Sequence, residues 1–137
     1  MNEIRRQEVI ARARGWAMQP RRYSQEDCDP ESKYRLDCSG FVSMAWQLDV
    51  PGLTTVELPD LCRQIQNHEL LPGDVVMLGG PGTSGSGGHA ILFESWADAE
   101  QATFWAYEQV DAGTVHVVKM FPPSPPYLSY RYQRILE

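Results

Sequence analysis

The sequence has no long run of apolar residues and no excess of positive charge, and both absences exclude whole classes of protein. No stretch of the 137 residues approaches the roughly 18 to 20 apolar residues that a membrane-spanning helix needs. Residues 1–14 are charged throughout and lack the apolar core of a signal peptide. The net charge of −6 argues against nucleic acid as a partner, because phosphate binding depends on basic surface. We therefore expect neither a membrane span nor a nucleic-acid-binding protein.

Cysteines and metal-binding patterns are also scarce. The three cysteines leave at least one thiol unpaired in a monomer, and Cys38 is the candidate for that free thiol. Cys28 and Cys62 could pair in an oxidising compartment, but their spacing does not distinguish this from a buried, free Cys62. The sequence has no CxxC or HxxxH pattern. We therefore expect no structural zinc site, and no cofactor is predicted.

The apolar periodicity changes from helical to strand-like near residue 70. Residues 3–18 predict an amphipathic helix that Pro20 ends, and a second helix is predicted from Cys38 to Leu48. Residues 59–66 are expected to add a short helical piece, and the prolines of residues 122–126 a rigid connector. Strands are predicted at Asp74–Leu78, His89–Ser95, Thr103–Gln109, Thr114–Met120 and Tyr130–Leu136. This order indicates one α+β domain over residues 1–137, with helices packed on a mainly antiparallel sheet of five to six strands.

Cys38 lies where the second helix is predicted to begin, directly after Asp37 as its N-cap. A helix N-terminus favours negative charge, and the thiolate is the nucleophilic form of cysteine. The amide of Cys38 could help to hold an oxyanion, and Gly40 has no side chain to block a ligand above the first turn. A lone cysteine is most often a small buried apolar residue, so the prediction of a nucleophile also needs a base nearby.

His89 is the candidate base, because it begins an apolar strand directly after a glycine-rich run over residues 79–88. That run lacks the lysine and the following helix of a phosphate-binding loop, and a mobile rim beside an active site suits it better. His68 falls in a turn-like segment and His116 alternates with valines, so both are expected to be exposed. A histidine beside a cysteine can take and return the proton of an acyl transfer.

A base of this kind needs a partner for its other ring nitrogen. Glu108 is the preferred candidate, because an acid among apolar strand neighbours is costly without a partner. Gln109 stays as the alternative if the strand register differs by one residue. Glu94 is disfavoured because it lies on the opposite strand face from His89. An exposed edge carboxylate is a further interpretation of Glu108.

Several segments together resemble the NlpC/P60 family of papain-like cysteine peptidases. The matching motifs are Asp37–Val42 at the helix start, Leu71–Val76 around a Pro-Gly-Asp turn, and Gly88–Phe93 at the histidine strand. Similarity to an actinobacterial branch is carried by Tyr23–Gln25, Tyr34–Cys38 and Tyr130–Tyr132. The resemblance covers nearly the whole chain, and the cysteine motif is its most specific part.

The resemblance implies a papain-like α+β fold and hydrolysis of peptide bonds in bacterial cell-wall peptides. The typical target is the bond between D-γ-glutamate and the diamino acid that follows. By position, it implies Cys38 as nucleophile, His89 as base, Glu108 as third residue and Tyr23 as an aid to the oxyanion. It also implies a substrate cleft lined by Asp37, Ser39 and Gly88. The family's third residue is usually a histidine or a neutral amide.

Two other functions stay open. A papain-like acyltransferase would keep the thioester and pass the acyl group to an amine or a lipid. A silent binding module would keep the cleft without turnover, and loss of the cysteine or histidine would mark it; both residues are present. A toxin acting on a rival's cell wall would use the peptidase chemistry and would bring an inhibitor protein as a partner. Members of the family usually act outside the cell, and the sequence indicates neither an export route nor an oligomeric state.

Overall fold

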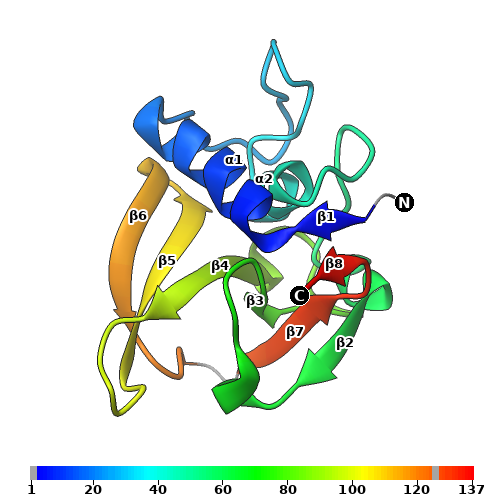
Figure 1. The fold of residues 1–137 in the computed structure, drawn as a ribbon. Coiled ribbons are helices and arrows are strands. Elements are labelled where there is room, and N and C mark those ends of the chain that lie inside the picture. The colour runs from blue at the N-terminus through cyan, green and yellow to red at the C-terminus, as the bar shows by residue number, and fades with distance from the viewer. Residues whose placement is uncertain (1–2, 125–126) are drawn as a thin grey trace.

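Two helices pack on one face of a large antiparallel sheet in the computed structural model, which describes residues 3–124 and 127–137 (Figure 1). The helices of this part are α1 (Arg6–Met18) and α2 (Cys38–Ala45). The strands of the large sheet lie in the order β2 (Cys62–Ile65), β7 (Leu128–Tyr132), β3 (Val75–Leu78), β4 (His89–Trp96), β5 (Thr103–Val110) and β6 (Gly113–Met120). All neighbouring strands in it run antiparallel. The predicted α+β class and the mainly antiparallel sheet are confirmed.

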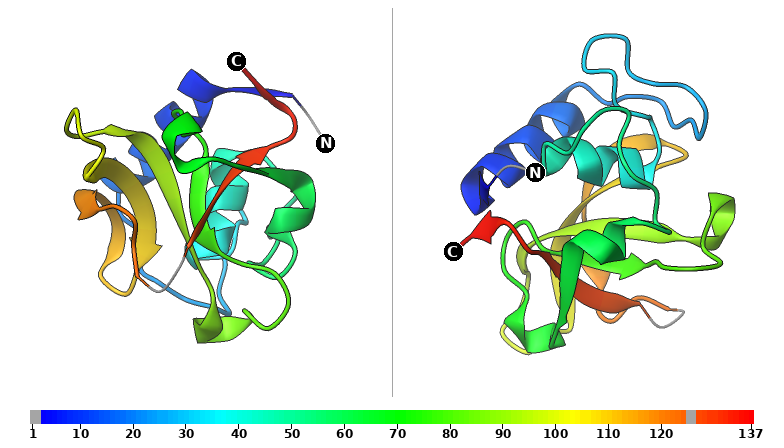
Figure 2. Two further views of the ribbon diagram at one scale, coloured as in Figure 1. Left: turned by 90° about the horizontal axis from the view of Figure 1, so that it is seen from below. Right: turned by 90° about the vertical axis from the view of Figure 1, so that its right-hand side faces the viewer.

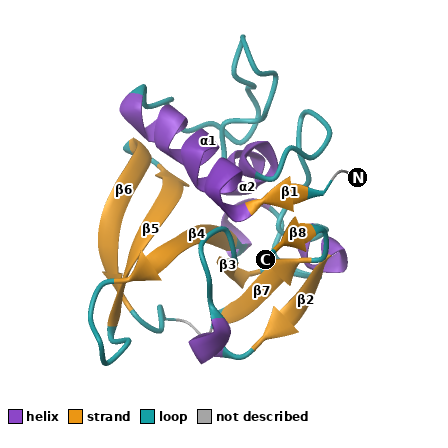
Figure 3. Ribbon diagram, viewed as in Figure 1, coloured by secondary structure: helices purple, strands orange, loops and turns teal. Residues whose placement is uncertain are grey.

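The two ends of the chain meet in a small parallel sheet of β1 (Ile4–Arg5) and β8 (Ile135–Leu136). Short 3₁₀ turns occur at η1 (Leu58–Leu61), η2 (Asn67–Glu69) and η3 (Gly85–Gly87). Figure 3 shows where the helices (purple) and the strands (orange) lie along the chain. No helix within the described residues is long and apolar enough to cross a membrane.

Four predicted boundaries are wrong, and each has a local cause. Residues 4–5 pair with the C-terminal strand and so begin no helix. The second helix ends at Ala45, because Gln47 adopts a positive φ of 56°. The predicted helical piece continues only to Leu61, after which β2 pairs with β7. The predicted last strand divides into β7 and β8. Of the predicted proline connector, Pro125 and Pro126 lie outside the described residues.

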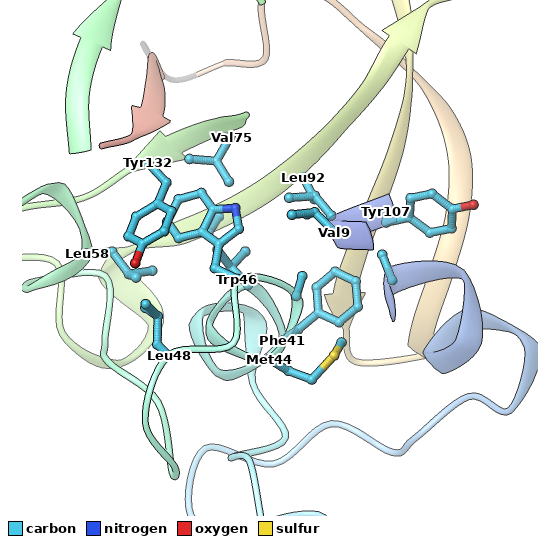
Figure 4. Close-up of a cluster of buried hydrophobic side chains, with 14 of the residues drawn as sticks. Val9, Phe41, Met44, Trp46, Leu48, Leu58, Val75, Leu92, Tyr107 and Tyr132 are labelled. Carbon is cyan, nitrogen blue, oxygen red and sulfur yellow. The ribbon is translucent and has the colours of Figure 1, made fainter. Parts of the chain in front are cut away.

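The main core fills the space between the two helices and the sheet (Figure 4). Val9 of α1 and Phe41 of α2 are fully buried there and lie near Leu92 of β4. Trp46 stacks on Tyr132 of β7 at 5.1 Å between ring centroids. Burying side chains of this size contributes on the order of 2 to 3 kcal/mol each. The start of α2 is therefore held firmly against the sheet.

A second apolar cluster lies on the other face of the sheet, since successive strand residues point to opposite faces. Ile91 and Phe93 of β4 and Ala106 of β5 belong to it. Phe121 and Tyr127, from the segment between β6 and β7, pack against this cluster. Figure 2 shows the helices on one side of the sheet and β2 and β6 at its two edges.

Asp74 fastens the start of β3 to two other parts of the fold. Its side chain is fully buried and accepts hydrogen bonds from Arg131 of β7 and Arg6 of α1, at 2.9 and 3.0 Å. It also accepts a hydrogen bond from the amide of Leu71, which closes the Pro-Gly-Asp turn. A buried carboxylate is tolerable only with partners of this kind. The turn therefore fixes the strand that runs beside β4.

Candidate active site

Cys38, His89 and Glu108 come together although they lie on α2, β4 and β5. Nε2 of His89 lies 2.8 Å from Oε2 of Glu108. An ionised carboxylate can only accept, so Nε2 carries the proton of this hydrogen bond. A further hydrogen bond joins His89 to the Cys38 side chain. With Nε2 engaged by Glu108, Nδ1 is the ring nitrogen left for the thiol.

The neighbours of His89 change how readily it holds a proton. Burial by itself lowers the pKa of His89, but the hydrogen bonds and charges of Cys38 and Glu108 raise it to about 9. For Glu108, burial alone would raise the pKa, but the hydrogen bonds and charges of His89 and Lys119 bring it below its usual value. Glu108 is only 4% exposed. The arrangement therefore favours a protonated imidazole beside an ionised carboxylate.

Strand register explains why Glu108 and not Gln109 meets the histidine. Leu92 pairs with Tyr107 and Phe93 with Ala106, so His89 and Glu108 lie diagonally on one face of neighbouring strands. Gln109 points to the other face and donates to the carbonyl oxygen of Arg21 at 2.8 Å. Its role here is to hold the segment that leads to Tyr23.

The start of α2 is fixed by Arg35, a residue that carried no functional signal in the sequence. Asp37 caps the helix by accepting from the Gly40 amide at 2.8 Å, and it also binds Nε of Arg35 at 2.8 Å. The hydroxyl of Ser39 accepts from Arg35 at 3.1 Å. Arg35 in turn donates to the Leu53 carbonyl at 2.7 Å. These contacts set the position of the Cys38 amide and thiol.

Three residues at this helix start, Asp37, Ser39 and Gly40, are engaged in the structure of the protein itself. Asp37 and Ser39, predicted to line the substrate cleft, are 9% and 3% exposed, and their polar groups are engaged within the protein. Gly40 was expected to leave room for a ligand. A Cβ atom there would lie 2.0 Å from the carbonyl oxygen of Arg35, so the glycine makes room for the chain itself.

An open cleft of about 530 Å³ lies beside His89. It is lined by Tyr23, Gln25, Gly88, His89, Gln109, Val110, Asp111 and Ala112. This volume falls in the range of ordinary small-ligand sites. Gly88 lines this cleft. It packs against Thr55, whose Oγ1 would lie 2.3 Å from a Cβ atom at this position. The cleft therefore reaches His89 directly.

Tyr23 also lines the cleft and lies in the loop between the helices. Its hydroxyl accepts a hydrogen bond from Nε2 of Gln25 at 3.1 Å, which leaves its own proton free to donate. Burial raises the pKa of Tyr23, and the charges of Cys38, Asp37 and Asp111 raise it further, against the bond from Gln25. The phenol therefore stays neutral at physiological pH and keeps its O–H as a donor near Cys38.

Two further residues at the site carried no clear signal in the sequence. Lys119 of β6 places Nζ 2.9 Å from Oε1 of Glu108. Tyr127 meets the His89 ring edge-on, with ring centroids 6.4 Å apart. Burial raises the pKa of Tyr127, and the charges of Glu108 and Cys38 raise it further. The alternation of side chains along a strand could have predicted that Lys119 and Glu108 share a face of the sheet. Their contact, however, depends on how β5 pairs with β6.

The other candidate residues lie away from this cluster. His68 and His116 are exposed, as predicted. Nε2 of His116 lies 2.7 Å from Oε1 of Glu94, within a larger groove of about 840 Å³ that Arg14 and Trp105 also line. The cysteines, which all fall in the described ranges, are free of disulfides. Burial raises the pKa of Cys62 to about 12, and nearby Asp74 adds to this shift.

Neither metal ligands nor known relatives add to this picture. Within the described residues, no group of three His, Cys, Asp or Glu side chains could hold a metal ion. No protein-family model matches the chain, and no curated protein matches it either. A thiol at a helix start, an imidazole bonded to it and a buried carboxylate behind that ring are together equipped for acyl transfer.

Proposed function

We propose that this protein is a cysteine peptidase or amidase with a papain-like fold, which hydrolyses peptide bonds of bacterial cell-wall peptides through a thioester. One observation carries the proposal: His89 meets Glu108 through Nε2 at 2.8 Å and is also hydrogen-bonded to the Cys38 side chain. The helix that begins at the cysteine packs on the strand that begins at the histidine, which supports a papain-like arrangement. The substrate class rests on the NlpC/P60-like motifs of the sequence.

In the first half of the reaction, Sγ of Cys38 attacks the amide carbonyl carbon and the carbonyl π electrons move to oxygen. His89 takes the proton of the thiol on Nδ1, and Glu108 holds the ring in place through Nε2. The Cys38 amide and the Tyr23 hydroxyl are the donors available to the oxyanion. When the tetrahedral intermediate collapses, the C–N bond breaks and the leaving amine takes the proton from Nδ1.

In the second half, water replaces the departed amine. Neutral His89 takes a proton from water as its oxygen attacks the thioester carbon. The C–S bond then breaks, releasing the carboxylic acid and restoring the Cys38–His89 pair. The cleft beside His89 gives water and substrate a common route to the ring.

Product analysis tests this proposal. The full chain is incubated with soluble peptidoglycan fragments, including peptides with a γ-D-glutamyl–diamino acid bond, and products are identified by mass spectrometry. We expect cleavage, incorporation of ¹⁸O from labelled water into the new carboxyl group, and loss of turnover in Cys38→Ala. Cys28→Ser serves as the matched control because this cysteine is exposed. Full activity in Cys38→Ala would contradict the mechanism, and preferential capture of the acyl group by an added amine would favour a transferase.

A further inference from the structure

Glu108 is held between two positively charged partners and uses a different oxygen for each. Oε2 accepts from His89 at 2.8 Å and Oε1 accepts from Lys119 at 2.9 Å. The carboxylate side chain is 5% exposed and the lysine side chain 30%. Little water can therefore reach the carboxylate to stabilise its negative charge. The two positively charged side chains stabilise it instead.

The geometry of the β5–β6 pair makes this contact specific. Lys119 pairs with Phe104, while Glu108 pairs with Val115, so the two charged side chains start four residue pairs apart on one face. Between them, opposite Val117, stands Ala106, whose side chain is a single methyl group. The lysine stem can therefore extend across this position, along the second apolar cluster, to reach Glu108.

We propose that Glu108 and Lys119 act on His89 as one net-neutral acceptor, with Lys119 as a positioning residue of the site. An isolated carboxylate would attract the imidazolium strongly and so make loss of its proton less favourable. The ammonium group reduces that attraction in two ways: it withdraws charge from the carboxylate, and it repels the imidazolium directly. The ring keeps a fixed tautomer while its proton stays transferable.

Other ionisable groups lie beside the His89–Glu108 pair or line the same cleft. They are Cys38 on α2, Tyr23 after α1, Asp111 in the β5–β6 turn and Tyr127 before β7. Of these, Cys38 is hydrogen-bonded to His89 itself, so a change in its charge would act directly on the ring. A clean measurement therefore removes that thiol first.

The test follows the His89 ring by NMR in the full chain carrying Cys38→Ala and ¹⁵N-labelled histidine, with His89→Gln used to assign the signal. Adding Lys119→Met should raise the pKa of His89 by about half a unit to one unit, because repulsion and neutralisation are both lost. Lys119→Arg should restore the value of the Cys38→Ala protein. Arg63→Met is the matched control, because it removes one positive charge from an exposed position on β2 at the opposite edge of the sheet.

A second variant separates charge from hydrogen bonding and serves if the methionine disturbs folding. Lys119→Gln keeps a donor for Glu108 but no charge, and it should raise the pKa of His89 as Lys119→Met does. An unchanged or lowered pKa in both variants would overturn the inference, because a merely structural lysine would loosen the pair and let His89 return toward 6.5.

The catalytic consequence rests on the proposed function, but the NMR readout does not. With an active substrate, Lys119→Met should lower kcat at pH 7 by about 3- to 10-fold, since hydrolysis of the thioester needs the neutral ring, while KM changes little. A shifted His89 titration without any peptide turnover would leave the coupling intact and refute only the peptidase.

Discussion

Two histidine–glutamate pairs lie on opposite faces of the same sheet, and their comparison shows what distinguishes a candidate active site from a surface contact. The ring–carboxylate distances are nearly equal, 2.8 Å for His89–Glu108 and 2.7 Å for His116–Glu94. The first pair is closed in, with 26% and 5% of its side chains exposed, against 37% and 20% for the second.

The partners beyond each pair differ more than the pairs themselves. His89 reaches a thiol at a helix start, and Glu108 reaches Lys119. His116 stacks on Tyr107 at 4.1 Å between ring centroids, and Glu94 has Arg14 at 3.8 Å. A hydrogen bond between a strand histidine and a carboxylate is thus not by itself a sign of an active site, because this sheet contains two of them. What makes the first pair a candidate catalyst is the thiol that is hydrogen-bonded to its ring.

The largest expected effect comes from removing each histidine in turn. His89→Gln should lower kcat/KM by at least about 10³-fold, because no base then serves the thiol. His116→Gln should leave kcat/KM within about twofold of the parent. Steady-state hydrolysis of the same peptide by both variants measures the difference. Equal losses in the two variants would erase the distinction between the pairs.

Removing the two carboxylate charges should give a smaller contrast. Glu108→Gln should slow turnover by about 10- to 100-fold, since the amide oxygen can still accept from Nε2 but stabilises the imidazolium less. Glu94→Gln makes the same chemical change at the exposed pair and should have no measurable effect on rate. If Glu108→Gln were as active as the parent, Glu108 would be only a structural neighbour of His89.

The pH dependence of stability should show the smallest contrast. His89 holds its proton more tightly when folded, with a pKa of about 9 against an ordinary 6.5, so this stabilisation is complete below pH 6.5 and is lost as pH rises through 9. The pKa of Glu108 is lowered, so its contribution is present above about pH 4.5 and is lost in acid. The pair therefore stabilises most between about pH 4.5 and 6.5.

Urea unfolding at pH 6, 8 and 10 measures this contribution. The parent should lose at most about 3 kcal/mol from His89 over that range, and Glu108→Gln should lose less. Glu94→Gln should follow the parent, because exposed ion pairs contribute little. A Glu108→Gln curve parallel to that of the parent would show that the carboxylate does not hold the proton of His89.

The residues with strong local signals could be predicted from the sequence. Cys38 stands at a helix start, His89 begins an apolar strand, and parity along β5 separates Glu108 from Gln109. Their meeting in space is a property of the structure, but each position could be selected in advance. The α+β class could be predicted from the change of apolar periodicity, from helical to strand-like, near residue 70.

The residues that were missed act through contacts between distant segments. Lys119 reaches Glu108 only because of the β5–β6 register and the small Ala106 between them. Arg35 acts through carbonyl groups of residues 52 and 53, far along the chain. Strand β2 was not predicted, because its two middle residues are polar and exposed and its apolar residues do not alternate as in a strand. Such features are fixed by tertiary pairing and leave little trace in local sequence.

The most direct test of the central claim compares the three cysteines of the folded protein. Intact-mass spectrometry and peptide mapping follow their alkylation by iodoacetamide from pH 5 to 9, with Cys38→Ala as the control. Cys28 is exposed and serves as the reference thiol, while Cys62 is buried with its pKa raised to about 12. We expect Cys38 to react at least about tenfold faster than Cys28 at pH 6, well below the pH where a free thiol ionises, and Cys62 to stay unlabelled. A Cys38 that reacts no faster than Cys28 would contradict an activated nucleophile at this site.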